Sequence, residues 1–120
     1  DADFPSDTRS VGSARAFAQR TLEGWREDAL GDTVTLLLSE LVTNAVVHAA
    51  SAPNVAIHLL PDRVHVEVAD ADTTELHAVD ASPDAESGRG LTLVEALADR
   101  WGQVALPDGK VVWFEVLRPS

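Results

Sequence analysis

Hydrophobic residues recur at helical spacing through the first part of the chain. From Val11 to about Asp28 they fall three or four residues apart, with arginine and glutamate on the other face, which predicts an amphipathic helix. Gly31 is expected to end this region and Asp32 to cap the next helix. The first ten residues are polar and predict a lead-in without regular structure.

The segment 33–50, TVTLLLSELVTNAVVHAA, predicts a second helix with apolar residues on nearly all sides, which is typical of a buried helix. Glu40, Asn44 and His48 interrupt it at i, i+4 and i+8, so they share one side. Because a carboxylate on a buried helix needs a partner, a metal ion or a water-filled cavity, this stripe is predicted to line a site. The alternative is a surface Glu40, a buried Asn44 bonded to backbone, and a His48 that holds the helix end.

Apolar and polar residues alternate over 55–59 and 64–68, on either side of Pro61-Asp62-Arg63, which predicts a β-hairpin. Its second strand leads into Asp70 and is expected to be central. Residues 71–87 are small, polar and acidic and predict a long loop, which in a compact domain is usually functional or disordered. A third helix from Leu91, a short strand over 104–106, a turn at 107–109 and a final strand over 111–117 are expected to follow.

This order of elements predicts an α+β fold. Because the strands arrive in hairpins, we expect a two-layer sandwich with a mostly antiparallel mixed sheet and its helices on one face. A chain of 120 residues fits a single domain, so residues 1–120 are expected to form one unit.

Composition narrows the function. Nine Lys and Arg face 20 Asp and Glu, giving a net charge of −11, so nucleic acid and anionic membrane are not expected partners. A small phosphate ligand remains possible because metal ions and backbone N–H groups bind phosphate without lysine or arginine. There is no cysteine, which excludes disulfides and thiolate chemistry. No leader-like segment opens the chain and no apolar run approaches the ~18 residues of a membrane span, so a cytoplasmic protein is expected.

Two further positions carry candidate chemistry. Asp70, at a strand end, could accept hydrogen bonds from a ligand amino group or cap the following turn. Gly88-Arg89-Gly90 precedes a helix, where glycines and unpaired N–H groups suit phosphate. The alternatives there are a hinge with Ser87 as its cap and an Arg89 that balances acidic neighbours.

The histidines outside the helix show no zinc-site spacing. His58, His65 and His77 are expected in solvated positions. The chain also lacks the G-x-S-x-G nucleophile elbow and the G-x-x-x-x-G-K-[ST] phosphate loop.

Three segments in order resemble the sequence boxes of the GHKL (Bergerat-fold) ATPases, the superfamily of gyrase, Hsp90, histidine kinases and MutL. SELVTNAVVHA at 39–49 resembles the N box, VEVAD at 66–70 the strand before the adenine-binding aspartate, and GRGLTLV at 88–94 the second glycine box. The three segments are most similar in sequence to the short branch typified by anti-sigma-factor serine/threonine kinases, which are abundant in actinobacteria. The C-terminal segments of that branch resemble residues 97–102 and 109–114 of this chain. The resemblance covers about residues 4–117.

The resemblance implies ATP and Mg²⁺ as cofactors. Glu40 would be the general base, Asn44 the Mg²⁺ ligand, and Asp70 the acceptor for the adenine amino group. Residues 71–87 would form the ATP lid. The remaining nucleotide-binding positions would lie directly after it: Gly88, Arg89, Gly90 and Leu91. The implied substrate is a serine or threonine of an anti-anti-sigma (STAS) protein, the alternative partner is a sigma factor, and relatives often form homodimers.

Two departures from the family pattern affect the expected nucleotide affinity. The superfamily usually has Asp-x-Gly where this chain has Asp70-Ala71-Asp72, and many relatives have a threonine near Lys110. Nucleotide affinity could therefore be low or lost, which keeps a second hypothesis open: a degenerate GHKL domain that binds a regulator without turnover. A histidine-kinase catalytic domain is disfavoured because the chain lacks a phospho-acceptor hairpin and an F-box segment.

Overall fold

A computed structural model describes residues 2–23, 28–48, 51–71 and 93–118. Helix α1 spans Arg9–Thr21, and α2 spans Asp28–Thr43 and continues directly into a π-helical segment, Asn44–His48. Residues 93–97 are also helical. The strands are β1 (Ala2–Asp3), β2 (Asn54–Leu59), β3 (Arg63–Asp70), β4 (Arg100–Leu106) and β5 (Gly109–Leu117).

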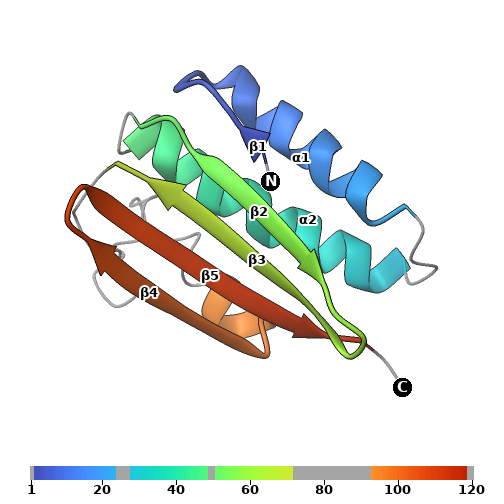
Figure 1. The fold of residues 1–120 in the computed structure, drawn as a ribbon. Coiled ribbons are helices and arrows are strands. Elements are labelled where there is room, and N and C mark those ends of the chain that lie inside the picture. Colours follow the sequence, from blue (N-terminus) through green and yellow to red (C-terminus); the bar gives the residue numbers. More distant parts are fainter. Residues whose placement is uncertain (1, 24–27, 49–50, 72–92, 119–120) are drawn as a thin grey trace.

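The strands form one five-stranded sheet in the order β1-β2-β3-β5-β4, and every pairing between these described strands is antiparallel. The pairing of β3 with β5 runs from Arg63 opposite Leu117 to Asp70 opposite Lys110. Helices α1 and α2 lie on one side of the sheet, and its other face carries no helix among the described residues (Figure 1). The predicted α+β two-layer architecture, with the Asp70 strand at the centre, is confirmed.

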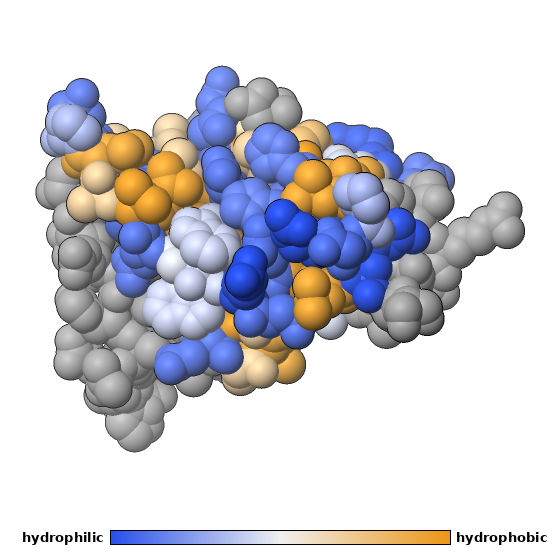
Figure 2. All heavy atoms as spheres, turned by 60° about the horizontal axis from the view of Figure 1, so that its bottom comes forward, coloured by the Kyte–Doolittle hydropathy of each residue, from blue (hydrophilic) through white to orange (hydrophobic). Residues whose placement is uncertain are grey.

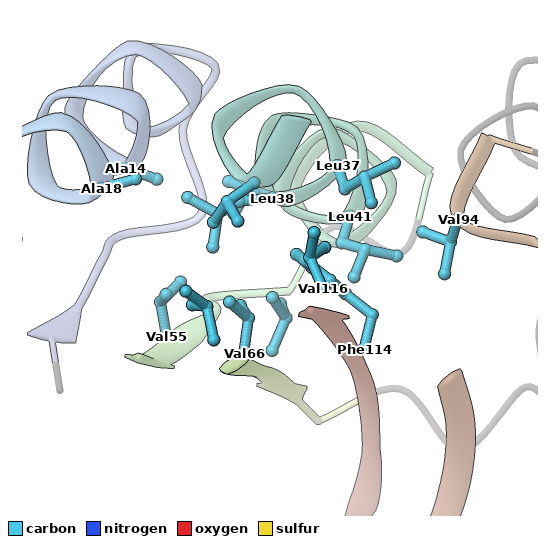
Figure 3. Packing of buried hydrophobic residues seen from close by; sticks show 14 of the residues in the cluster. Ala14, Ala18, Leu37, Leu38, Leu41, Val55, Val66, Val94, Phe114 and Val116 are labelled. Atoms are coloured by element: carbon cyan, nitrogen blue, oxygen red, sulfur yellow. The ribbon is translucent and has the colours of Figure 1, made fainter. Parts of the chain in front are cut away.

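Alternation along the strands explains the layers. The apolar residues of β3 and β5 that face the helices are all buried: Val64, Val66, Val68, Val112, Phe114 and Val116. They meet the leucines of α2, which lies beside α1 on the same face of the sheet (Figure 3). Helix α2 is apolar on most sides because both the sheet and α1 pack against it. Each such side chain contributes roughly 1.5–3 kcal/mol by leaving water.

Several predicted boundaries were wrong at the N-terminal end. Helix α1 ends at Thr21, and α2 begins at Asp28, so Gly31 lies inside α2 and Asp32 does not cap it. The reason is that Leu30 and Val34, one turn apart, are both buried and extend the apolar stripe, which outweighs the ~1 kcal/mol helix cost of glycine.

The polar lead-in is also more ordered than expected. Residues Ala2 and Asp3 form β1 beside β2, and the amide of Phe4 donates to the Pro53 carbonyl at 2.9 Å. Strand β4 begins at Arg100 rather than at residue 104, because it pairs with β5 along its whole length.

One segment, Leu30–Val47, is long and apolar enough to cross a membrane by length and composition. Of this window, 56% is buried inside the protein. It packs against α1 and the sheet, which accounts for its apolar character (Figure 3).

Candidate functional site

Asn44 lies where α2 changes into the π-helical segment. Its side chain is buried, the residue being 4% exposed, and its amide nitrogen Nδ2 has no hydrogen-bond partner among the described residues. An unsatisfied buried polar group costs about 1–3 kcal/mol, and single π-helical turns occur often at functional sites. The structure therefore presents a buried donor that a ligand could satisfy, rather than the backbone bond considered from the sequence.

Glu40 lies one turn before Asn44 on the same side of α2 and is partly buried. The hydroxyl groups around it bond to their own helix: Ser39 Oγ donates to the Leu36 carbonyl at 2.8 Å, and Thr43 Oγ1 to the Ser39 carbonyl at 2.7 Å. In this segment, the side chains of Glu40 and Asn44 could therefore contact a ligand.

Asp70 ends β3 on the side of the sheet that faces the helices, as its register with the buried valines requires. Its Oδ1 accepts a hydrogen bond from Nζ of Lys110 at 3.1 Å, and both side chains are only 5% exposed. Lys110 stood out in the sequence as a departure from the family pattern, but this buried ion pair was not predicted.

Ser51 connects the end of the α2 segment to the end of β3. Its amide donates to the Ala45 carbonyl at 2.8 Å, and its Oγ accepts from the Ala71 amide at 2.9 Å. Ala45 follows Asn44 and Ala71 follows Asp70, so the chain segments of these two predicted site residues meet at one edge of the molecule. Ser51 itself is buried and was not singled out from the sequence.

Other predicted site residues lie outside the described residues: Gly88, Arg89, Gly90 and Leu91, together with loop residues 72–87, His77 and the side chain of His48. Immediately after them, Val94 is buried in the core, where it faces α2 (Figure 3). The third predicted helix is therefore described over 93–97 alone.

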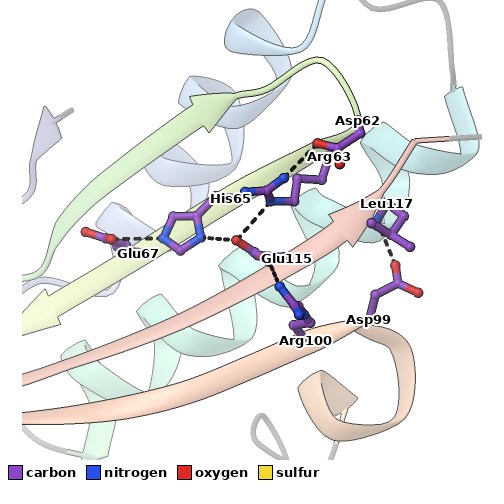
Figure 4. Close-up of polar contacts among 8 residues, drawn as sticks. All are labelled: Asp62, Arg63, His65, Glu67, Asp99, Arg100, Glu115 and Leu117. Atoms are coloured by element: carbon purple, nitrogen blue, oxygen red, sulfur yellow. Dashed lines mark hydrogen bonds and ion pairs between the residues drawn. The ribbon is translucent and has the colours of Figure 1, made fainter.

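A second polar cluster lies on the open face of the sheet (Figure 4). Glu115 Oε2 lies 2.8 Å from Nδ1 of His65 and 3.2 Å from Nε of Arg63, and Glu67 lies 2.9 Å from the other ring nitrogen of His65. Trp113 stacks on His65 with ring centroids 5.5 Å apart. The expectation of a solvated His65 was wrong, because Glu67 on its own strand and Glu115 on β5 supply a carboxylate for each ring nitrogen.

The charge state of Glu115 follows from these contacts. Burial alone would raise the pKa of Glu115, but the hydrogen bonds from His65 and Arg63 outweigh it and hold the pKa below its ordinary value.

Hydrophilic residues predominate over the described part of the face drawn in Figure 2, with hydrophobic residues in small groups.

Comparison with known proteins identifies the family of the chain. Residues 4–116 match the family model of the histidine kinase-like ATPase domain. No curated protein sequence matches the chain.

Two solved structures of the blue-light activated histidine kinase of Erythrobacter litoralis EL346 are similar in fold. Its histidine kinase domain gives a TM-score of 0.57 and 16% identity over 93% of this chain and 60% of that one. A longer form gives 0.52 and 19% over 73% and 30%. This chain thus spans less than two thirds of either structure, and the likeness concerns the fold. With a family match over nearly its whole length, the chain belongs to the histidine kinase-like ATPase domains of the GHKL superfamily.

Proposed function

We propose that the chain is a cytoplasmic, ATP-binding anti-sigma factor that phosphorylates a serine or threonine of a STAS partner. Family membership implies ATP binding. The observation that carries the proposal is the buried side-chain amide of Asn44, whose nitrogen has no hydrogen-bond partner among the described residues. Asn44 lies one turn from Glu40, and Ser51 links its chain segment to Ala71, the residue after Asp70. The resemblance of 39–49 and 88–94 to the serine/threonine kinase branch supports the acceptor class.

The proposed roles follow from the chemistry of each side chain. Glu40 takes the proton of the acceptor hydroxyl as its oxygen bonds to the γ-phosphorus, and the bond from that phosphorus to the β–γ bridging oxygen breaks to leave ADP. Asp70 is the position that the family resemblance assigns to the adenine amino group, and its carboxylate here accepts a hydrogen bond from Lys110. Asn44 fits the role of a Mg²⁺ ligand, because amide oxygens are among the ligands that Mg²⁺ binds. Its side-chain nitrogen, which has no partner among the described residues, can donate a hydrogen bond to a phosphate oxygen. Bound Mg²⁺ would neutralise phosphate charge.

A second candidate is a non-catalytic domain that binds a sigma factor or STAS protein. The observation that favours it is the buried Asp70–Lys110 pair, because the carboxylate assigned to adenine already holds an ammonium group. This candidate differs from the first in needing no nucleotide turnover.

Calorimetry with Mg-ATP, followed by γ-phosphate transfer to STAS proteins, tests the proposal. Asn44→Ala should weaken Mg-ATP binding about tenfold or more, since it removes a charge-assisted contact. Glu40→Gln should bind Mg-ATP like the wild type but lose phosphate transfer by about 100-fold or more. The exposed Glu23→Gln is the matched control and should change neither measurement.

The outcomes separate the two candidates. No binding heat from the wild type removes the kinase. Partner binding that persists without nucleotide and is unaffected by Glu40→Gln establishes the binding domain instead.

A further inference from the structure

Lys110 is the only lysine in the chain, and it is one of the few charged residues that are buried. Lysine is almost never fully buried without a partner, so its place in the interior needs a reason. It shares the helix-facing side of β5 with Val112 and Phe114, at the end of the strand, directly opposite Asp70.

The backbone fixes this position. Gly109, just before Lys110, approaches the Asp70 carbonyl so closely that no Cβ atom fits there. The start of β5 is therefore pressed against the end of β3, and Lys110 leaves the backbone opposite Asp70. The 3.1 Å contact follows from register and close strand approach.

We infer that Lys110 is a specificity-determining residue, whose ammonium group occupies the acceptor that a purine 6-amino group would use on Asp70. The inference rests on the proposed nucleotide site. A charge-assisted hydrogen bond is about twice as strong as a neutral one, so a neutral base amino group competes poorly for a carboxylate whose charge is already neutralised. The site then recognises a nucleotide through its phosphates and ring rather than through the 6-amino group.

The wild-type protein gives the first test. Calorimetry would compare Mg-ATP with the Mg²⁺ complex of purine riboside triphosphate, which differs in lacking the 6-amino group. We expect dissociation constants within about fivefold of each other. A hydrogen bond to an uncommitted carboxylate would give a preference for ATP of about tenfold or more, and that result overturns the inference.

Lys110→Thr gives the second test. Releasing Asp70 should strengthen Mg-ATP binding about tenfold and leave purine riboside triphosphate unchanged. Lys110→Arg, which keeps the ion pair, should bind ATP like the wild type. The double variant Asp70→Asn, Lys110→Thr should lose the gain, because the released charge is gone. Circular dichroism checks that each variant is folded, and the wild-type comparison stands if Lys110→Thr does not fold.

The outcomes also separate this inference from the proposed function. If the wild type binds ATP and Lys110→Thr binds it no more tightly, the inference is overturned and the proposed nucleotide site is unaffected. Binding by Lys110→Thr but not by the wild type supports the inference and removes ATP binding from the natural chain. No binding of either nucleotide by any variant overturns both.

Discussion

Strands β3 and β5 carry a carboxylate cluster on each face of the sheet, and the two clusters differ in construction. On the helix side, Asp70 meets Lys110 at the strand ends, with both side chains 5% exposed. On the open side, Glu115 lies within ion-pair distance of His65, Arg63 and Arg100, and these side chains reach water. The first cluster centres on one buried ion pair. In the second, one carboxylate, that of Glu115, lies close to several partly exposed side chains.

The difference indicates what each cluster does. A shared, partly solvated cluster ties neighbouring strands together and tolerates the loss of a member, because water and the other cations compensate. In a buried pair water cannot compensate in this way, so removing one partner is costly. The helix-facing pair includes Asp70, which the proposed function assigns to the nucleotide site.

The largest expected effect comes from breaking the buried pair. Lys110→Met removes the ammonium group from the buried Asp70 carboxylate and should lower the free energy of unfolding by about 3–5 kcal/mol in urea denaturation. The double variant Asp70→Leu, Lys110→Met should recover most of that loss, because the carboxylate is removed together with the ammonium group. The exposed Arg15→Met on α1 is the control and should change stability by less than about 0.5 kcal/mol. Equal stability of the single and double variants would show that the charges are not coupled.

The sheet was largely predictable from sequence because its strands alternate. The valines of 64–68 and the apolar positions of 112–116 gave the strands and their inward faces. The same alternation contained an unused signal: Asp70 and Lys110 share the parity of those inward residues, so both had to face the helices. Their direct contact was not predictable, since it depends on the register between strands 40 residues apart.

The helical part was less predictable. Glu40 and Asn44 stand out as polar positions on an apolar helix, and burial of Asn44 is confirmed. The π-helical turn at Asn44 and the link through Ser51 arise from tertiary packing and leave no pattern in the sequence. Gly31 misled the boundary because buried neighbours override a local helix breaker.

A smaller effect is expected from filling two glycines, one next to the Asp70–Lys110 pair and one beside Trp113. In Gly109→Ala the new Cβ would meet backbone, the Asp70 carbonyl, which cannot move alone, so a loss of about 2–3 kcal/mol is expected. In Gly102→Ala it would meet the Trp113 indole, 2.8 Å from Nε1, and a side chain can shift, so about 1 kcal/mol is expected. Urea denaturation of the two variants ranks them. A greater loss in Gly102→Ala would mean that the Trp113 indole is held more rigidly than the backbone at the end of β3.

The smallest effect, and the one that depends on pH, concerns Glu115. Because the pKa of Glu115 in the folded protein lies below its ordinary value of 4.5, its ionised form stabilises the fold above that value. This stability is lost as the pH falls through the lower folded pKa. Glu115→Gln should cost about 1–2 kcal/mol near pH 7, since it gives up hydrogen bonds to charged groups. The difference from the wild type should shrink as the pH falls below 4.5 and the wild-type carboxyl takes up its proton.

Glu67→Gln is the matched control on the same face. Glu67 contacts the other ring nitrogen of His65 but its side chain is 43% exposed, so water replaces much of the lost contact and the cost should stay below about 0.5 kcal/mol. Urea denaturation at several pH values gives both differences. A Glu115→Gln difference that is the same near pH 3 as near pH 7 would show that packing rather than charge holds this carboxyl in place. The open-face cluster would then differ from the Asp70–Lys110 pair in kind, because its stability would not depend on an ionised group.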